Sequence, residues 1–190
     1  MNAGRNAAKK IAVLAMLTGL SLIMFLIENL FPTILPGARM GLANIFSLVA
    51  LIMYSPLEAF AVVVIRTFLG AVFAGNISMV LYSLTGGVVS MAVSSVFLYT
   101  LYPAISIMSI SIAAAVAHNI TQNIVFVFVS GTALIFGYMP YLVLLGILSG
   151  AIVGGVTLLI FRGLPLNLFA KIIHERKKNL KHTDSQITLS

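Results

Sequence analysis

The sequence contains no cysteine and very little charge. Without cysteine, the chain forms no disulfide bond, thiolate metal site or cysteine nucleophile. Only 8% of its 190 residues are charged, whereas a soluble domain carries roughly a quarter. No Lys, Arg, Asp or Glu occurs between Arg66 and Arg162. A stretch of this length without charge cannot cover a surface that faces water, so the composition excludes a soluble protein.

The motifs of several kinds of chemistry are also missing. No GxxxxGKS-type loop occurs, so we expect no ATP binding of the P-loop kind. Asp184 is the single aspartate, and no carboxylates cluster in the apolar segments, as metal-assisted diphosphate chemistry would require. His174 and His182 lie in the basic tail, far from His118, so we expect no histidine metal site. The chain is therefore predicted to be no enzyme and to hold neither metal nor cofactor.

Long apolar segments dominate what remains. The chain is 61% hydrophobic, with a mean hydropathy of +1.13. Since a helix needs about 20 apolar residues to cross the hydrocarbon of a bilayer, we expect an all-α membrane protein, a bundle of six transmembrane helices. The predicted spans are residues 11–30, 40–54, 57–75, 77–101, 105–129 and 141–161. The second span is short, and a re-entrant pair formed by the second and third is the alternative.

The first span resembles a signal peptide in its basic start. Its apolar stretch runs into Glu28 without a small-residue cleavage site, which favours a retained helix.

Basic residues concentrate at the two ends of the chain. Nine of the eleven precede the first span or follow the sixth: Arg5, Lys9, Lys10, Arg162, Lys171, Arg176, Lys177, Lys178 and Lys181. The positive-inside rule then places both termini in the cytoplasm. This divides the chain into a cytoplasmic N-terminal segment (1–10), a transmembrane substrate-binding domain (11–162) and a basic cytoplasmic tail (163–190). The tail is expected to contact anionic lipid rather than nucleic acid.

Two arginines lie away from the tails. Arg39 is expected at the outer end of the second span and Arg66 near the middle of the third. An arginine at that depth costs on the order of 3 kcal/mol or more unless it faces protein or water. Two interpretations stay open for Arg66: a core residue bonded to Glu28, Glu58 or backbone carbonyls, or a residue that lines a ligand cavity, which we favour.

The fifth span carries polar side chains at its middle, in the stretch AHNITQN at 117–123. His118 and Gln122 are four residues apart, as are Asn119 and Asn123, so each pair shares one helical face. A hydrogen bond between helices would explain a single amide. The whole group favours a cavity.

Other polar residues fall in the outer halves of the predicted spans, including Asn29, Asn44, Asn76, Tyr82 and Thr85. The inner halves are nearly pure Ala, Val, Leu, Ile, Phe and Gly. This asymmetry predicts a site open to the outside and shut from the cytoplasm, with Phe46, Tyr82 and Phe126 packing on the ligand. The predicted substrate-binding residues are Glu28, Arg39, Asn44, Arg66, Asn76, Tyr82, His118, Asn119 and Gln122.

Small residues recur at a spacing of four on three of the predicted spans. Such faces allow close approach of helix backbones. They occur at Ala8/Ala12 and Ala15/Gly19, at Gly86/Ser90/Ser94, and at Gly150/Gly154. Internal packing is the common use, and docking of another membrane subunit is the alternative on the first span.

Four stretches resemble a known family: KKIAVLAMLTGLSLIM (9–24), PGARMGLANIFSLVAL (36–51), YSPLEAFAVVVIRTFLGAVFAGN (54–76) and AHNITQN (117–123). Together they resemble the Gx transporter family, whose members are often labelled heptaprenyl diphosphate synthase component I. These proteins look like relatives of the substrate-binding S components of energy-coupling factor (ECF) transporters. The resemblance covers roughly residues 8–162. Its most specific parts are GLAN at 41–44, Arg66, and the group of His118, Asn119 and Gln122.

The resemblance implies a multi-pass protein of the bacterial cytoplasmic membrane that binds a small molecule from the outside. It also implies an ECF coupling subunit and two ATPases as partners, with the small-residue face at Ala8, Ala12, Ala15 and Gly19 contacting the coupling subunit. The expected ligand is vitamin-like or related to isoprenoids or quinones, and carries an anionic group. The alternatives are an accessory membrane subunit of heptaprenyl diphosphate synthesis, an autonomous secondary transporter, or a structural anchor.

Overall fold

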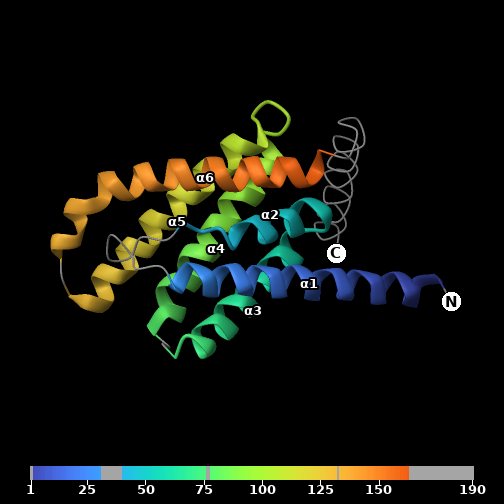
Figure 1. Ribbon diagram of the computed structural model, residues 1–190. Helices are drawn as coiled ribbons and strands as arrows, with labels where there is room; N and C mark the ends of the chain where they lie inside the picture. Colours follow the sequence, from blue (N-terminus) through green and yellow to red (C-terminus); the bar gives the residue numbers. More distant parts are fainter. Residues whose placement is uncertain (1, 31–39, 76–77, 132, 163–190) are drawn as a thin grey trace, which may run out of the picture.

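The computed structural model describes residues 2–30, 40–75, 78–131 and 133–162. Every regular element in these ranges is a helix (Figure 1). The helices are α1 (Asn2–Leu30), α2 (Asn44–Met53), α3 (Pro56–Phe73), α4 (Ser78–Thr100), α5 (Ile107–Ser130), the 3-10 helix η1 (Ala133–Tyr138) and α6 (Met139–Phe161). Within the described ranges, five helices (α1, α3, α4, α5 and α6) are long and apolar enough to cross a membrane. The chain is therefore a multi-pass helical membrane protein.

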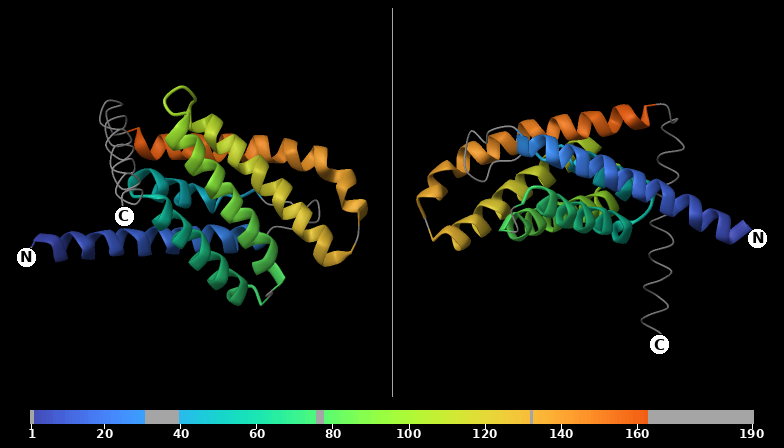
Figure 2. Two further views of the ribbon diagram at one scale, coloured as in Figure 1. Left: turned by 180° about the vertical axis from the view of Figure 1, so that it is seen from behind. Right: turned by 60° about the horizontal axis from the view of Figure 1, so that its bottom comes forward.

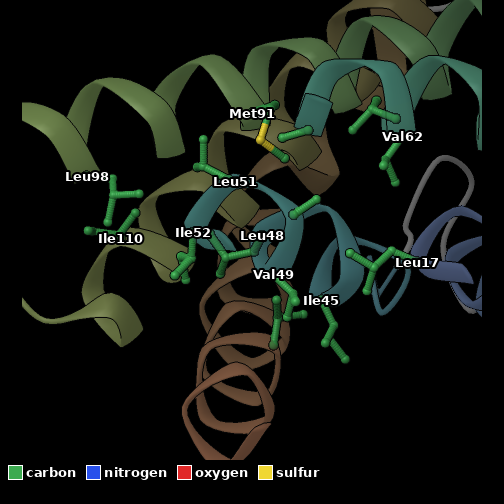
Figure 3. Packing of buried hydrophobic residues seen from close by; sticks show 14 of the residues in the cluster. Leu17, Ile45, Leu48, Val49, Leu51, Ile52, Val62, Met91, Leu98 and Ile110 are labelled. Atoms are coloured by element: carbon green, nitrogen blue, oxygen red, sulfur yellow. The ribbon is translucent and has the colours of Figure 1, made fainter. Parts of the chain in front are cut away.

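Within the predicted second span (40–54) the structure has a short helix inside the bundle, and the number of crossings stays a prediction. Helix α2 has ten residues, which at 1.5 Å per residue gives about 15 Å. That is half of the roughly 30 Å of bilayer hydrocarbon, so α2 alone cannot cross. Its residues pack against α1, α3, α4 and α6. Figure 3 shows Leu48, Leu51 and Ile52 of α2 lying among side chains of the surrounding helices, such as Met91 and Val62.

Helix ends follow local signals in the sequence. Helix α3 begins at Pro56, a position where the missing N–H of proline removes no helix hydrogen bond. The hydroxyl of Ser106 accepts the backbone N–H of Ser109 at 3.1 Å at the start of α5. The same helix ends at Gly131, whose φ of 68° is the left-handed conformation that glycine adopts without strain. These signals explain why the predicted limits of α3 and α5 differ from the observed ones by two residues or fewer.

Helices α4, α5 and α6 form one side of the bundle, where consecutive helices pack along their length (Figure 2). Glycines bring the backbones of α5 and α6 into contact. A Cβ atom added at Gly150 would lie 2.5 Å from Cα of Ile112, and one at Gly154 would lie 2.8 Å from Cα of Met108. The small-residue face of α6 therefore serves internal packing.

The first helix begins, and the last described helix ends, on the same side of the molecule. The start of α1 and the end of α6 lie at one end of the bundle in both figures (Figures 1 and 2). At this end Lys10 of α1 pairs with Glu58 in the first turn of α3, and the Lys10 ammonium also lies 5.7 Å from the centre of the Tyr54 ring. The arrangement agrees with termini on one side of the membrane, while their cytoplasmic location stays a prediction.

Candidate functional site

Arg66 lies in the middle of α3 and is only 3% exposed. Its Nη2 atom donates a hydrogen bond of 2.5 Å to Oδ1 of Asn44 at the start of α2. Glu58, one of the predicted partners, instead pairs with Lys10 and accepts a hydrogen bond from the Ser55 hydroxyl. Asn44, which the sequence analysis assigned to the ligand site, is therefore a side-chain partner of Arg66.

The GLAN turn at 41–44 is held in place by helix α1. The carboxylate of Glu28 accepts the backbone N–H of Leu42, and the hydroxyl of Ser21 donates to the carbonyl oxygen of Ala43 at 2.8 Å. Gly41 has a φ of 68°, which a side chain would strain. An added Cβ at Gly41 would also lie 3.0 Å from Nδ2 of Asn44. Two side chains of α1 thus fix the turn that presents Asn44 to Arg66.

A pair of glycines on α4 separates Arg66 from His118. A Cβ atom on Gly87 would lie 2.8 Å from Cγ1 of Val63 and 3.7 Å from Nη2 of Arg66. A Cβ atom on Gly86 would lie 3.2 Å from Cε1 and 3.3 Å from Nδ1 of His118. Consecutive residues of α4 therefore accommodate the arginine of α3 and the histidine of α5. The sequence indicated Gly86 only as part of a small-residue packing face.

The polar residues of α5 are buried and divide between two neighbours. Nδ2 of Asn119 donates to the carbonyl oxygen of Leu142 at 3.1 Å, and Nδ2 of Asn123 contacts the sulfur of Met139 at 3.5 Å. Both of these asparagines therefore hold α6. His118, on the other face, packs on Gly86 of α4. The four-residue spacing predicted this division into two faces.

Gln122 is completely buried, and neither atom of its amide has a hydrogen-bond partner among the described residues. Leaving a buried polar group without a partner costs about 1–3 kcal/mol. One turn further along α5, the ring of Phe126 packs edge-on against Tyr82 of α4, with 5.9 Å between the ring centres and 72° between the planes. On α5, Gln122 therefore lies between an aromatic pair and the contact of His118 with Gly86.

A small cavity of about 20 Å³ lies where α2, α4, α5 and α6 meet. This volume is enough for about one water molecule. Its polar lining consists of Asn44, Ser90, Ser94 and Ser111. Arg66, His118 and Gln122 do not line it, so the single chamber that the sequence predicted for these residues stays a prediction. Asn44 connects Arg66 to the cavity, because it lines the cavity and its Oδ1 accepts a hydrogen bond from Nη2 of Arg66.

The cavity extends from Asn44, in the predicted polar half of the bundle, to Ser94 and Ser111, in the half that the sequence predicted to be nearly pure apolar. That expectation is wrong for the interface of α4 with α5, where Ser94 and Ser111 are buried near the end of one helix and the start of the next. Ser111 is seven residues before His118 and so shares its face. This spacing was the signal in the sequence that could have identified the serine.

The remaining predicted site residues are distributed as follows. Arg39 and Asn76 lie outside the described residues. Ala8, Ala12 and Ala15 are exposed on α1, and a Cβ atom added at Gly19 would meet nothing within 4 Å. The small-residue face of α1 is thus turned away from the described part of the bundle.

These features define a class: multi-pass helical membrane proteins with polar side chains buried between their helices. A family model described as heptaprenyl diphosphate synthase component I matches residues 17–160. The match covers most of the chain, which therefore belongs to this family, as the resemblance of the sequence predicted. No curated protein matches the chain, and no solved structure does.

Proposed function

We propose that the chain is the substrate-binding membrane component of an ATPase-driven uptake system in the bacterial cytoplasmic membrane. In this proposal it takes a small molecule from the extracytoplasmic side and has both termini in the cytoplasm. The observation that carries the proposal is Gln122, a completely buried amide without a partner among the described residues. The large majority of buried side-chain polar atoms in proteins are hydrogen-bonded, and a bound ligand would supply the partner that this amide lacks.

The neighbours of Gln122 support binding more than simple packing. Asn119 and Asn123 already connect α5 to α6, so the hydrogen bonds that hold these helices do not need a further amide. Gln122 and His118 occupy the other face, towards α4. A ligand entering beside the Tyr82–Phe126 pair would reach Gln122 first and His118 one turn deeper.

The proposed ligand is vitamin-like or related to isoprenoids or quinones, with an anionic group. Arg66 and Arg39 would favour that group electrostatically, and Asn44, Asn119 and Asn76 would add oriented hydrogen bonds. Glu28 acts through the turn that it holds, by fixing Asn44. An apolar part of the ligand would pack on Tyr82 and Phe126.

The exposed face of α1 supports a second part of the proposal, the docking of a membrane coupling subunit. Ala8, Ala12 and Ala15 are exposed, and Gly19 has open space beside it. Small residues on a lipid-facing helix allow another helix to approach closely. In contrast, the glycines of α6 are already used against α5. Two ATPases would then supply the energy through the coupling subunit.

The description of the family favours a second candidate, an accessory membrane subunit of heptaprenyl diphosphate synthesis. In that case the chain would hold a soluble synthase at the membrane. Co-purification with a synthase, and loss of its activity when this chain is removed, would favour this candidate. Uptake by the purified chain alone in liposomes would instead favour a secondary transporter.

The test is native mass spectrometry of the protein purified in mild detergent. We expect the wild type to retain a small molecule and Gln122→Met to lose it. Thr157→Val is the matched control, because Thr157 is equally buried but its hydroxyl is bonded to the carbonyl of Val153. The control should keep the ligand. A wild type that retains nothing, and shows no thermal shift in a screen of vitamins and isoprenoids, contradicts the proposal.

A further inference from the structure

We infer that the serine-lined cavity is a subsite that receives one oxygen acceptor of the bound molecule, a carbonyl or carboxylate oxygen. The inference rests on the proposed function and adds residues that the sequence did not assign to the site. These are Ser90, Ser94 and Ser111, each 4% exposed or less. They surround the cavity together with Asn44.

The orientation of the Asn44 amide follows from its contact with Arg66. A guanidinium group only donates hydrogen bonds, so the atom that receives Nη2 of Arg66 is the amide oxygen. The amide nitrogen, Nδ2, is therefore left to donate elsewhere. It lies beside Gly41, 3.0 Å from the position of an added Cβ, and both residues line the cavity. Asn44, which lines the cavity, thus has one amide donor that its contact with Arg66 leaves available.

The three serine hydroxyls add donors that line the same cavity. Buried serines in helices commonly bond to a carbonyl of their own helix, as Ser95 does to Met91 and Ser149 to Gly146. Among the described residues, no hydrogen bond uses the hydroxyl of Ser90, Ser94 or Ser111. Because a hydroxyl hydrogen rotates freely, each of the three is available to donate to a group in the cavity that they line.

The size of the cavity selects the kind of group. About 20 Å³ accommodates one oxygen-sized group, so one oxygen of the ligand enters the cavity while the rest of the ligand lies outside it. The planar carbon of a carboxylate allows this, whereas the phosphorus of a phosphate carries three further oxygens, which need more room at the entrance. A carbonyl oxygen, or one oxygen of a carboxylate, fits both the volume and the excess of donors. An ammonium group does not fit, because the Asn44 donor would face a second donor. An ordered water molecule also fits this volume and accepts hydrogen bonds, and the test distinguishes a ligand oxygen from water.

The test uses small probes on the purified full-length protein at constant ionic strength. We expect acetate and acetamide to raise Tm by about 3–6 °C at concentrations tenfold above the dissociation constant. Inorganic phosphate and methylammonium should leave Tm unchanged. The double variant Ser94→Ala/Ser111→Ala should lose the shift, and Ser95→Ala, whose hydroxyl is bonded to its own helix, should keep it. Ser111→Ala alone is the milder variant should the double variant fail to fold.

Three results would overturn the inference. The first is a shift with phosphate equal to that with acetate, and the second is a shift that persists in the serine variants. The third is no shift with any probe, which would mean that the cavity holds water alone. If the wild type still retains a small molecule by native mass spectrometry, the proposed function stands without this subsite. If it retains none, the function itself fails.

Discussion

Arg66 and Asn44 are joined across the centre of the bundle by a hydrogen bond of 2.5 Å from Nη2 to Oδ1. The bond connects the middle of α3 to the first residue of α2, a helix that is too short to cross the membrane. Helix α1 holds the other side of this junction through Ser21 and Glu28. One group of buried polar residues thus meets at the start of α2, where the charge of Arg66, the amide of Asn44 and the cavity adjoin.

The first prediction concerns the two functions of the Asn44 amide. Asn44→Ala removes the acceptor for Nη2 of the buried Arg66, and we expect it to lower the free energy of unfolding by about 1.5–3 kcal/mol. Asn44→Asp keeps an acceptor for Arg66 but removes the Nδ2 donor. We therefore expect Asn44→Asp to retain more of the wild-type Tm than Asn44→Ala, yet to lose the acetate-induced shift. Thermal unfolding with and without acetate measures both effects. Equal Tm values for the two variants would contradict the assigned contact.

The second prediction concerns the glycine pair on α4. Gly87→Ala places a methyl group 2.8 Å from Cγ1 of Val63, and Gly86→Ala places one 3.2 Å from the ring and from the carbonyl oxygen of His118. Overpacking costs about 1–3 kcal/mol, so Gly87→Ala, with the closer contact, should have a lower Tm, while Gly86→Ala should displace the side chain of His118 by a few tenths of an ångström. Gly155→Ala is the control, because its methyl group would meet only Cε of Met108 at 3.8 Å.

In the control variant Gly155→Ala, the free energy of unfolding should rise by as much as about 1 kcal/mol, because alanine favours a helix more than glycine does. The readout specific to the site is ligand retention. Gly86→Ala should weaken it by displacing His118, and Gly155→Ala should not. Retention that is unchanged in Gly86→Ala, with the fold intact, would mean that His118 does not contact the ligand.

The sequence predicted the long helices well because their ends carry strong local signals. Pro56, Ser106 and Gly131 each determine an end through the geometry of one residue. The four-residue spacing on α5 also predicted which polar pairs share a face. Such features depend only on neighbouring residues, so they can be deduced without knowing how the helices pack.

Features that depend on packing between helices could not be deduced in this way. For Arg66 the sequence suggested Glu28, Glu58, backbone carbonyls or a ligand as partners. In the structure, Glu58 pairs with Lys10, and Asn44, an amide 22 residues before Arg66, accepts a hydrogen bond from the guanidinium. The length of α2 was overestimated for a related reason: a buried helix and a lipid-facing one are equally apolar, and composition does not distinguish them.

The third prediction concerns the ion pair between Lys10 and Glu58 at the junction of α1 with α3. The side chains are 43% and 19% exposed, respectively, and partly exposed pairs of this kind contribute about 0–1 kcal/mol. We expect Lys10→Met and Glu58→Gln each to lower Tm slightly, with a double variant close to either single one. Thermal unfolding at low and high salt measures these Tm values. The difference in Tm between the wild type and each variant should shrink at high salt, because salt screens the pair. A loss well above 1 kcal/mol, independent of salt, would mean that the pair is a core element of the fold.

The fourth prediction concerns the exposed small-residue face of α1. Ala15→Leu and Gly19→Leu add bulk where the structure has open space, since an added Cβ at Gly19 meets nothing within 4 Å. The isolated protein should therefore keep its Tm and its ligand. Docking of a coupling helix on this face would be blocked by either leucine, because close approach of helices needs small residues at the contact. We expect ATPase subunits to co-purify with the wild type and to be lost from both variants.

The control for this face is Met16→Leu, an exposed position beside it where the side chain stays large. It should keep the subunits, because the volume of the side chain hardly changes. Subunits that remain bound to Ala15→Leu and Gly19→Leu would exclude this face as the docking surface. That result would leave the proposed substrate site in place, because the contacts of α1 with the turn before Asn44 come from Ser21 and Glu28 and not from Ala15 or Gly19.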